Sequence, residues 1–387
     1  MHRLAIISTH PIQYYAPFFQ KLAERGRLDI RVFFGWRGAS ENATHDPGFG
    51  QDVQWDIPLL DGYAHTFVEN TAHDPGTHHF FGLVNPDLIP KIDDWQPDAV
   101  LVFGWGWWGH LRALYHFSGR VPVFFRGDST LLDEQPGFRM LLRRLFLHWV
   151  YRYVDVALYV GQHNRAYFRK HGLRDEQLVW APHAVENTRF YDEDGTYQQQ
   201  AEAWRSQLGI SDDAIAFVFA GKLDQKKDPL SLLNAFLALE AEDAHLVLAG
   251  SGPQEEELKQ RADENRRVHF IGFQNQSKMP VVYRLGDVFV LPSRSETWGL
   301  AVNEAMACGR PVVISDRVGC APDLVDDENG AIVPAGNPLA LRQTLEEFLR
   351  DEDRLQEMGQ CSAERISDWT IEEAAVRTEE AVQSVLN

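Results

Sequence analysis

The chain has few cysteines, and none of them is placed for a disulfide or zinc framework. Only Cys308, Cys320 and Cys361 occur among 387 residues, and no two of them have the C-x-x-C spacing. An odd number of widely spaced cysteines argues against a disulfide scaffold and against a structural zinc site. We therefore expect a protein of a reducing compartment, with a cytoplasmic location.

Long hydrophobic runs and net positive charge are also lacking. No stretch approaches the about 20 apolar residues that a membrane-spanning helix needs. The first apolar run is interrupted at Thr9, too early for a secretory signal. Basic residues number 37 against 56 acidic ones, a formal net charge of −19. This charge weighs against a nucleic-acid partner and against dependence on anionic membranes, although local basic patches are compatible with it. We expect no transmembrane segment.

The length and the order of the apolar runs predict two α/β domains in series. The 387 residues exceed the about 250–300 at which one hydrophobic core stops growing. Fully apolar runs alternate with helical patterns in both halves, which indicates doubly wound parallel sheets covered on both faces. The expected strands are 4–8, 30–34, 99–103, 121–125 and 156–160, then 215–220, 245–249, 268–271, 288–291, 311–314 and 331–333.

Helices are expected between these strands, and one polar segment is expected to divide the chain. The clearest helical patterns are 12–25, 138–153, 229–239, 300–308 and 370–386. The acidic stretch 186–200 is the predicted linker, so the expected domains are 1–185 and 201–365, with 366–387 as a terminal helix. Residues 38–80 are rich in Gly, His, Asp and Pro and are expected to form an elaboration. The default ligand site of such a chain is a central cleft faced by its two domains.

The most specific stretch of the sequence is 291–314, where a buried strand ends, a polar turn follows and a helix begins. Unpaired N–H groups and the dipole of a helix start attract an anion. The predicted phosphate seat consists of Thr297, Trp298, Gly299 and Leu300. Glu296 precedes the helix and Glu304 lies about one turn inside it, so we expect one carboxylate to face a sugar and the other a ribose.

A glycine and two lysines follow the first strand of the second half. Gly221 gives a tight exit from the strand, and Lys222 and Lys227 are placed to reach the same ligand as the helix start. Alone, such a lysine-rich run is usually a solvated loop. Its place in the same half as the two glutamates favours a phosphate-binding function.

Residues 291–314 resemble the E-x7-E signature of retaining glycosyltransferase family 4, whose members have the two-domain GT-B fold. In this family a basic residue after the strand-end glycine and a lysine five residues later hold the donor pyrophosphate, which implies that role for Lys222 and Lys227. Lys222 stands where arginine is more usual. Ala249-Gly-Ser-Gly-Pro resembles the G-x-G-P turn of the family. The loop with Gly272 and Phe273 resembles the one that offers backbone atoms to the nucleotide base.

The resemblance is strong over 215–335 and weak before residue 180. It implies that residues 1–185 bind the acceptor, that 201–365 bind the nucleotide-sugar donor, and that the terminal helix 366–387 packs back on the first domain. Family members often have a glycine-rich loop after the first strand, whereas this chain has His10 at the carboxyl end of that strand. Where many members carry a histidine, this chain has Arg126-Gly-Asp128. We expect His10, Arg126 and Asp128 on the acceptor side, with the last two taking over contacts to a sugar.

The resemblance implies a hexosyltransferase-like enzyme that transfers a sugar from a UDP- or GDP-sugar to a hydroxyl acceptor, with retention of configuration. Such a reaction serves polysaccharide or glycoconjugate synthesis. Lys222, Lys227 and the helix start would stabilise the departing diphosphate, so neither a metal ion nor another cofactor is expected. Glu296 would orient the sugar. Two alternatives remain open: a nonhydrolysing nucleotide-sugar epimerase and a noncatalytic nucleotide-sugar-binding protein.

Two other patterns are interpreted as structural. Residues 104–109 satisfy G-x-G-x-x-G, but three tryptophans crowd the turn, which is unlike a loop whose backbone must approach a pyrophosphate. The histidines at 65, 73, 78 and 79 could suggest a metal site, but they lie in a glycine- and proline-rich loop without helical or strand spacing. We expect neither a dinucleotide cofactor nor a metal site.

Overall fold

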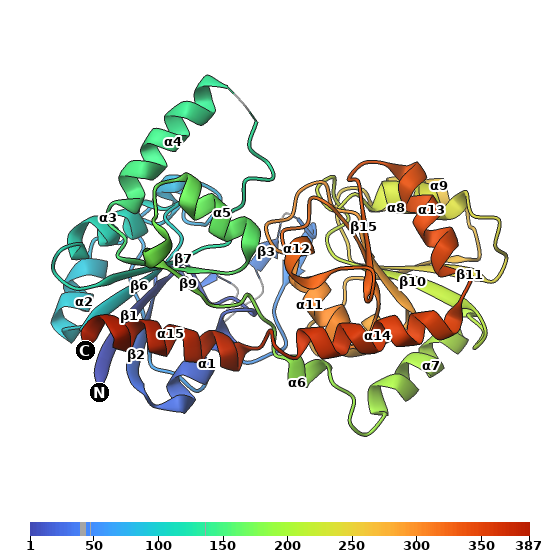
Figure 1. The fold of residues 1–387 in the computed structure, drawn as a ribbon, viewed down its shortest axis with the longest axis horizontal. Coiled ribbons are helices and arrows are strands. Elements are labelled where there is room, and N and C mark those ends of the chain that lie inside the picture. Colours follow the sequence, from blue (N-terminus) through green and yellow to red (C-terminus); the bar gives the residue numbers. More distant parts are fainter. Residues whose placement is uncertain (39–43, 47, 136) are drawn as a thin grey trace. The chain divides into compact units, whose positions relative to one another are not determined.

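The computed structural model describes residues 1–38, 44–46, 48–135 and 137–387, which form two α/β units, each around a parallel sheet (Figure 1). The first unit comprises Met1–Thr44, Ile57–His183 and Ile371–Asn387, and the second comprises His45–Asp56 and Ala184–Thr370. The predicted fold class, α/β with two doubly wound domains, is confirmed. A short piece of the predicted elaboration, residues 45–56, belongs to the second unit.

The sheet of the first unit has seven strands in the order β5-β2-β1-β6-β7-β8-β9. Its strands are β1 (His2–Ser8), β2 (Leu28–Phe34), β5 (His65–Phe67), β6 (Ala99–Phe103), β7 (Val123–Arg126), β8 (Val156–Tyr159) and β9 (Leu178–Trp180). Its helices are α1 (Ala16–Arg25), α2 (Leu88–Trp95), α3 (Trp108–Phe117), α4 (Phe138–Tyr151), α5 (Gln162–Lys170) and α15 (Ile371–Leu386), with the short η2 (Phe80–Gly82) and η3 (Asp175–Gln177). Five of these strands overlap the predicted ones; β5 and β9 span three residues each and left no pattern to recognise.

The sheet of the second unit has six strands in the order β12-β11-β10-β13-β14-β15. They are β10 (Ile215–Ala220), β11 (Ala244–Ala249), β12 (Val268–Gly272), β13 (Val288–Leu291), β14 (Val312–Ser315) and β15 (Gly330–Val333). The helices are α6 (Asn187–Phe190), α7 (Thr196–Leu208), α8 (Pro229–Leu237), α9 (Glu255–Ala262), α10 (Met279–Arg284), α11 (Leu300–Ala307), α12 (Ala321–Leu324), α13 (Pro338–Phe348) and α14 (Glu352–Ile366). A separate two-stranded sheet joins β3 (Thr44–Asp46) and β4 (Gln51–Val53).

The order of this second sheet decides where functional side chains gather. Its paired strands are all parallel, and the side chains of β10 and β13 are almost completely buried. The strands therefore serve as the core, and their carboxyl ends lie at one edge of the sheet. The loops that follow β10, β11, β12 and β13 meet at that edge, which is the usual ligand side of an open α/β sheet.

The first helix begins later than the sequence pattern predicts. The carbonyl of Ile12 accepts hydrogen bonds from the amides of Tyr15 and Ala16, so residues 12–15 form a turn. The helix α1 begins at Ala16, with a proline in its first turn, where the missing N–H is not needed. The prediction of a helix from residue 12 was wrong by one turn.

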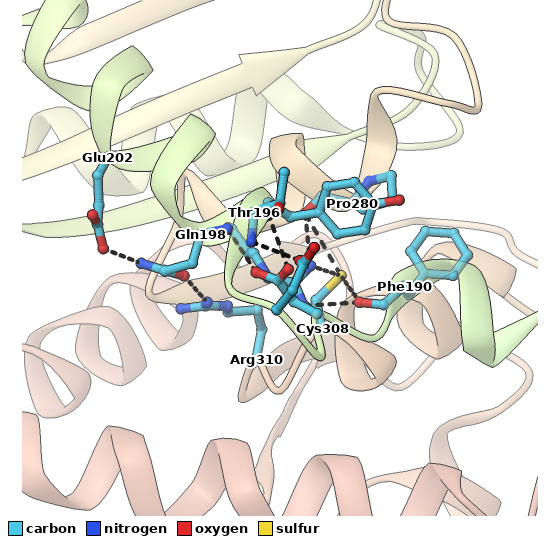
Figure 2. Close-up of polar contacts among 11 residues, drawn as sticks. Phe190, Thr196, Gln198, Glu202, Pro280, Cys308 and Arg310 are labelled. Carbon is cyan, nitrogen blue, oxygen red and sulfur yellow. Dashed lines mark hydrogen bonds and ion pairs between the residues drawn. The ribbon is translucent and has the colours of Figure 1, made fainter.

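The segment 186–200, predicted as a linker, carries α6 and the start of α7. Figure 2 shows how it is held: Gln198 accepts from Arg310 at 3.2 Å and donates to Glu202 at 3.1 Å. The thiol of Cys308 lies 3.8 Å from the carbonyl of Phe190 and 3.9 Å from that of Pro280. Polar composition suggested a loose connection, whereas these contacts anchor the segment to the end of α11.

The helix α15 belongs to the first unit, where it packs on α1 and β9. Arg25 of α1 donates to Glu379 at 2.9 Å and also contacts Glu372. The chain reaches this helix from α14 of the second unit through Ser367–Thr370. In the part of the chain that the structure describes, no helix is both long enough and apolar enough to cross a membrane.

Candidate functional site

Main-chain hydrogen bonds tie together the loops that follow three neighbouring strands of the second unit. The amide of Gly221 donates to Ala249 at 3.0 Å, and the amide of Gly250 donates to Gly272 at 2.8 Å. One step further along, Leu223 donates to the carbonyl of Ser251 at 2.9 Å. The exits of β10, β11 and β12 thus form one connected surface.

Glycine is required where these exits approach each other. A Cβ atom on Gly250, whose φ is +138°, would lie 1.9 Å from the carbonyl oxygen of Gly221. A Cβ on Gly252 would lie 2.7 Å from the carbonyl oxygen of Leu223. The turn that resembles G-x-G-P therefore has a packing role: it lets the loop with the two lysines lie against the β11 exit.

Lys227 and Glu296, predicted from separate motifs, are brought together. The Lys227 ammonium forms an ion pair with the Glu296 carboxylate, and both side chains are less than a quarter exposed. The two loops are also joined by their main chains, because the amide of Arg294 donates to the carbonyl of Lys226 at 2.7 Å. The amide of Lys227 is held by the carboxylate of Asp224 at 2.9 Å. A cation and an anion thus share the space between the exits of β10 and β13.

Burial lowers the pKa of Lys227 to about 8, since removing the ammonium from water disfavours its charged form. Asp224 opposes this shift, whereas the charges of Lys222 and Lys226 add to it. An anionic ligand that reached Lys227 would therefore favour its charged form.

Lys222 is paired with a residue from the 45–56 segment. Its ammonium lies 2.8 Å and 3.1 Å from the two carboxylate oxygens of Asp46 and 4.9 Å from the centre of the Phe49 ring. Burial tends to raise the pKa of Asp46, but the Lys222 hydrogen bond and charge, with two backbone amides, hold it below its usual value. Sequence reasoning missed Asp46 because it precedes Lys222 by 176 residues in the chain.

The loop predicted to meet a nucleotide base carries an aromatic cluster. The ring of Phe273 lies 4.9 Å from that of Phe49 and 6.3 Å from that of Trp55, centre to centre. Gly272, with a φ of +67°, ends β12, and no atom lies within 4 Å of where its Cβ would stand. Open space beside a partly buried aromatic ring suits a flat ligand.

The four residues of the predicted phosphate seat differ in whether their side chains can contact a ligand. Gly299 caps α11 with a φ of +99°, and Leu300 begins the helix. Trp298 is buried: its indole N–H donates to Asn303 at 2.9 Å and its ring lies 5.3 Å from that of Trp369. Thr297 is exposed. Only the main chain of Trp298 is therefore placed to meet a ligand, while its side chain supports the loop.

Glu304 is more enclosed than its sequence position suggested. Its side chain is 2% exposed, and one carboxylate oxygen accepts a 2.6 Å hydrogen bond from the hydroxyl of Tyr283. Glu296 and Glu304 thus have different partners, a lysine and a phenol. Tyr283 was missed because it follows an apolar run on α10, which predicts a core residue.

In the first unit, Arg126 and Asp128 lie near Tyr15 and His183, which the sequence analysis did not identify. The Arg126 guanidinium donates to the carbonyls of Ala181 at 3.0 Å and Pro182 at 2.9 Å, and burial lowers its pKa to about 10. Burial, followed by the Arg126 charge, lowers the pKa of His183 to about 4. The rings of His183 and Tyr15 stack at 6.1 Å. Arg126 is therefore engaged with the backbone, which weakens the expectation that it contacts a sugar directly.

His10 stands at the carboxyl end of β1, as predicted. It forms a 2.9 Å hydrogen bond with Thr9, and its ring lies 5.6 Å from that of Trp36. Burial lowers its pKa to about 4, so it is neutral at physiological pH. Its assignment to an acceptor stays a prediction.

Two features bear on metal binding. Asp192-Glu-Asp194 and Asp351-Glu-Asp353 have the Asp-x-Asp spacing of metal-dependent transferases. In both motifs the first aspartate binds amides in the first turn of a helix. Asp192 accepts from the amides of Tyr197 and Gln198 in α7, and Asp351 accepts from that of Arg354 in α14. Ligand atoms of Asp74, His78 and His79 lie within 4.8 Å of one another on the surface of the first unit. The expectation of no metal site stays a prediction.

Comparison with known protein families finds a match for most of the second unit. Residues 200–365 match the family described as glycosyl transferases group 1. An uncharacterized glycosyltransferase of Methanocaldococcus jannaschii is 34% identical over 38% of this chain and 39% of its own length. A D-inositol 3-phosphate glycosyltransferase of Corynebacterium diphtheriae is 33% identical over 47% of this chain and 45% of its own length. The matched part of the chain thus spans less than half of these two relatives.

A longer match joins this chain to a GDP-mannose-dependent monoacylated alpha-(1-6)-phosphatidylinositol monomannoside mannosyltransferase of Corynebacterium glutamicum. The two are 28% identical over 69% of this chain and 71% of the relative.

Solved structures share the fold over nearly the whole chain. A sucrose-phosphate synthase from Thermosynechococcus elongatus has a TM-score of 0.73 at 20% identity, covering 99% of both chains. Anabaena Alr3699/HepE, in complex with UDP and glucose, has a TM-score of 0.74 at 17% identity, covering 99% of this chain and 100% of its own. The chain therefore has the GT-B fold, and its residues 200–365 match the family described as glycosyl transferases group 1.

Proposed function

We propose that this protein is a retaining, metal-independent glycosyltransferase that transfers a sugar from a UDP- or GDP-sugar to a hydroxyl acceptor. The observation that carries the proposal is the ion pair of Lys227 with Glu296 at the carboxyl edge of the second sheet, with Glu296 beside Gly299 at the start of α11. Lys222 is close enough for its charge to lower the pKa of Lys227. These three residues come from the two motifs that resemble the family, and all lie within the matched residues 200–365.

The donor diphosphate, in this proposal, lies between the exit of β10 and the start of α11. Breaking the glycosidic bond leaves negative charge on the diphosphate, and Lys222, Lys227 and the first amides of α11 stabilise that charge without needing to reorganise. Binding of the donor replaces the Asp46 carboxylate on Lys222 and the Glu296 carboxylate on Lys227. Glu296, once released from its ion pair, accepts hydrogen bonds from hydroxyls of the sugar.

The nucleoside is assigned to the neighbouring exits. The base lies beside Gly272 and Phe273, whose ring is held edge-on by Phe49 and tilted against Trp55. Glu304 meets the ribose through the carboxylate that Tyr283 holds. The hydroxyl acceptor is bound by the first unit, on the side of His10, Arg126 and Asp128.

A donor panel tests the proposal. The names of the relatives include both GDP-mannose and UDP with glucose, so both nucleotide classes belong in a thermal-shift experiment. A bound donor at about 100 times its dissociation constant adds about 2.7 kcal/mol to the free energy of unfolding. We expect stabilisation by one nucleotide class and sugar transfer to a hydroxyl in the presence of an acceptor extract. Conversion of the donor without any acceptor would instead indicate an epimerase, and binding without turnover would indicate a noncatalytic protein.

The role of Glu296 is tested separately. Glu296→Gln keeps the size of the side chain, removes its charge and is expected to lower kcat more than donor affinity, because sugar contacts that strengthen in the transition state appear in kcat. Glu304→Ala is expected to weaken donor binding mainly. The opposite pattern would exchange the two assignments.

A further inference from the structure

The helix α4 carries its apolar side chains on the outside. The large exposed apolar residues of the helix are Phe138, Leu141, Leu142, Leu145, Phe146 and Trp149. Their positions follow the spacing i, i+3, i+4, i+7, i+8 and i+11, which places them on one face of a helix. The core contacts of α4 come from the opposite face, at Leu147, Val150 and Tyr151. We call the six exposed residues the outer face of α4.

The exposure is largest in the first half of the helix. Phe138 is 74% exposed and Leu145 is 63% exposed, whereas a surface helix normally turns such residues inward. Phe146 and Trp149, at 37% and 39%, also contact the rings of Trp105 and Tyr153. The buried residues of α4 all lie in its second half, and Figure 1 shows its first half standing away from the rest of the first unit. From Phe138 to Trp149 the outer face runs about 16 Å along the helix. A patch of this kind marks a contact with another surface.

The charge of the segment indicates which surface. Residues 135–154 contain four arginines, at 139, 143, 144 and 152, and no Asp or Glu, in a chain whose net charge is −19. Arg139 and Arg152 are exposed. Apolar side chains on one face, including a tryptophan, flanked by arginines, are the composition of a helix that lies in the interface of a bilayer with anionic lipids.

A second copy of this chain fits less well. In a symmetric dimer the same patch meets itself, which would bring the arginines of both copies together without an acidic residue of the segment to pair with them. An anionic bilayer instead supplies both the apolar phase and the opposite charge.

We infer that α4 is an interfacial anchor, which lays its outer face into the surface of a membrane that contains anionic phospholipids. This inference does not depend on the proposed function, because it rests on one helix of the first unit and is read out as binding. The overall negative charge does not oppose it, since charges more than about 8 Å away are largely screened at physiological ionic strength.

The test is co-sedimentation of the purified full chain with vesicles of phosphatidylcholine alone or mixed with phosphatidylglycerol. We expect binding to the mixed vesicles, weak binding to phosphatidylcholine alone, and a decrease with added salt. The double variant Leu142→Gln, Leu145→Gln should lower the partition at least tenfold. Arg139→Gln and Arg152→Gln should each lower binding to anionic vesicles about fivefold, the effect of one basic residue near such a surface.

A matched control lies in the second unit, where Leu339 of α13 is as exposed as Leu145, at 63%. Leu339→Gln should leave vesicle binding unchanged. Because all these positions are exposed, the variants should keep the thermal unfolding temperature of the parent. The inference is overturned if the parent protein does not bind anionic vesicles, or if Leu339→Gln lowers vesicle binding as much as the α4 variant does. It is also overturned if sedimentation velocity shows a dimer that the α4 variant abolishes.

Discussion

At the scale of single residues, removal of Lys227 should strongly lower the rate of sugar transfer. Lys227→Ala should lower kcat by about 10²–10³, the range for loss of one preorganised group from a site where charge develops. Lys222→Ala should behave alike. Lys226→Ala, on an exposed neighbour in the same run, is the control and should change little. Single-turnover kinetics at low and high salt measure this; equal, small and salt-sensitive effects in all three would indicate a solvated loop.

The lowered pKa of Lys227 predicts a pH dependence. The ammonium is charged below about 8 and loses its proton as the pH rises through that value, so kcat/KM should fall on the alkaline side with a midpoint near pH 8. In Lys227→Arg the guanidinium stays charged over the whole accessible range. That variant should lose the alkaline decrease, whatever its overall rate. A profile that is the same in both proteins would assign the decrease to another group.

Asp46 competes with the donor for Lys222, in our proposal. Asp46→Asn removes the negative charge but keeps an acceptor for the Gly48 amide, which Asp46 holds at 2.8 Å. The donor KM should therefore fall severalfold, with little change in kcat. Asp52→Asn removes one charge from the same segment and is the control. A raised KM in Asp46→Asn would mean that the carboxylate assists the donor instead.

These residues show what the sequence alone predicted about the site. Lys222, Lys227 and Glu296 follow strand ends in recognisable motifs, so a local pattern was enough to single them out. Asp46 and Tyr283 act through contacts between distant parts of the chain, which no local pattern encodes. Trp298 looked like a ligand contact, but a tryptophan in a tight loop has more apolar surface to bury than the loop can leave exposed.

At the scale of elements, the close approach of the β10 and β11 exits makes that turn sensitive to substitution. Gly250→Ala would place a methyl group 1.9 Å from the carbonyl oxygen of Gly221. We expect a loss of about 1–3 kcal/mol in the free energy of unfolding, the usual effect of overpacking, together with weaker donor binding. Gly106→Ala is the control, because no atom lies within 4 Å of its Cβ position. Denaturant unfolding of the two variants measures the difference.

Elements with long apolar runs were predictable, and those held by specific polar contacts were not. The strands β6, β10 and β13 match the predicted bounds because an uninterrupted buried run has no other stable place in a parallel sheet. The start of α1 was misplaced because a turn at Ile12 has the same apolar spacing as a helix. The contacts of 186–200 depend on Arg310 and Cys308, more than 100 residues later, so composition alone suggested a linker.

At the scale of the whole molecule, the donor site should need no cation. Two lysines and a helix start at the proposed diphosphate position provide the positive charge that a metal ion would otherwise bring. Transfer activity should therefore persist in EDTA at the rate measured without it. Complete loss of turnover, restored by Mn²⁺ or Mg²⁺, would refute this mechanism and direct attention to Asp74, His78 and His79.

The path of the chain has a further consequence, for the order of synthesis. Because α15 belongs to the first unit but follows the whole second unit in sequence, a ribosome delivers residues 184–370 before the partner helix of α1. Domains usually fold as they emerge, starting from the N-terminus. Here the earlier unit must wait for its last helix with the α1 surface uncovered, so the later unit is the first that can complete its fold.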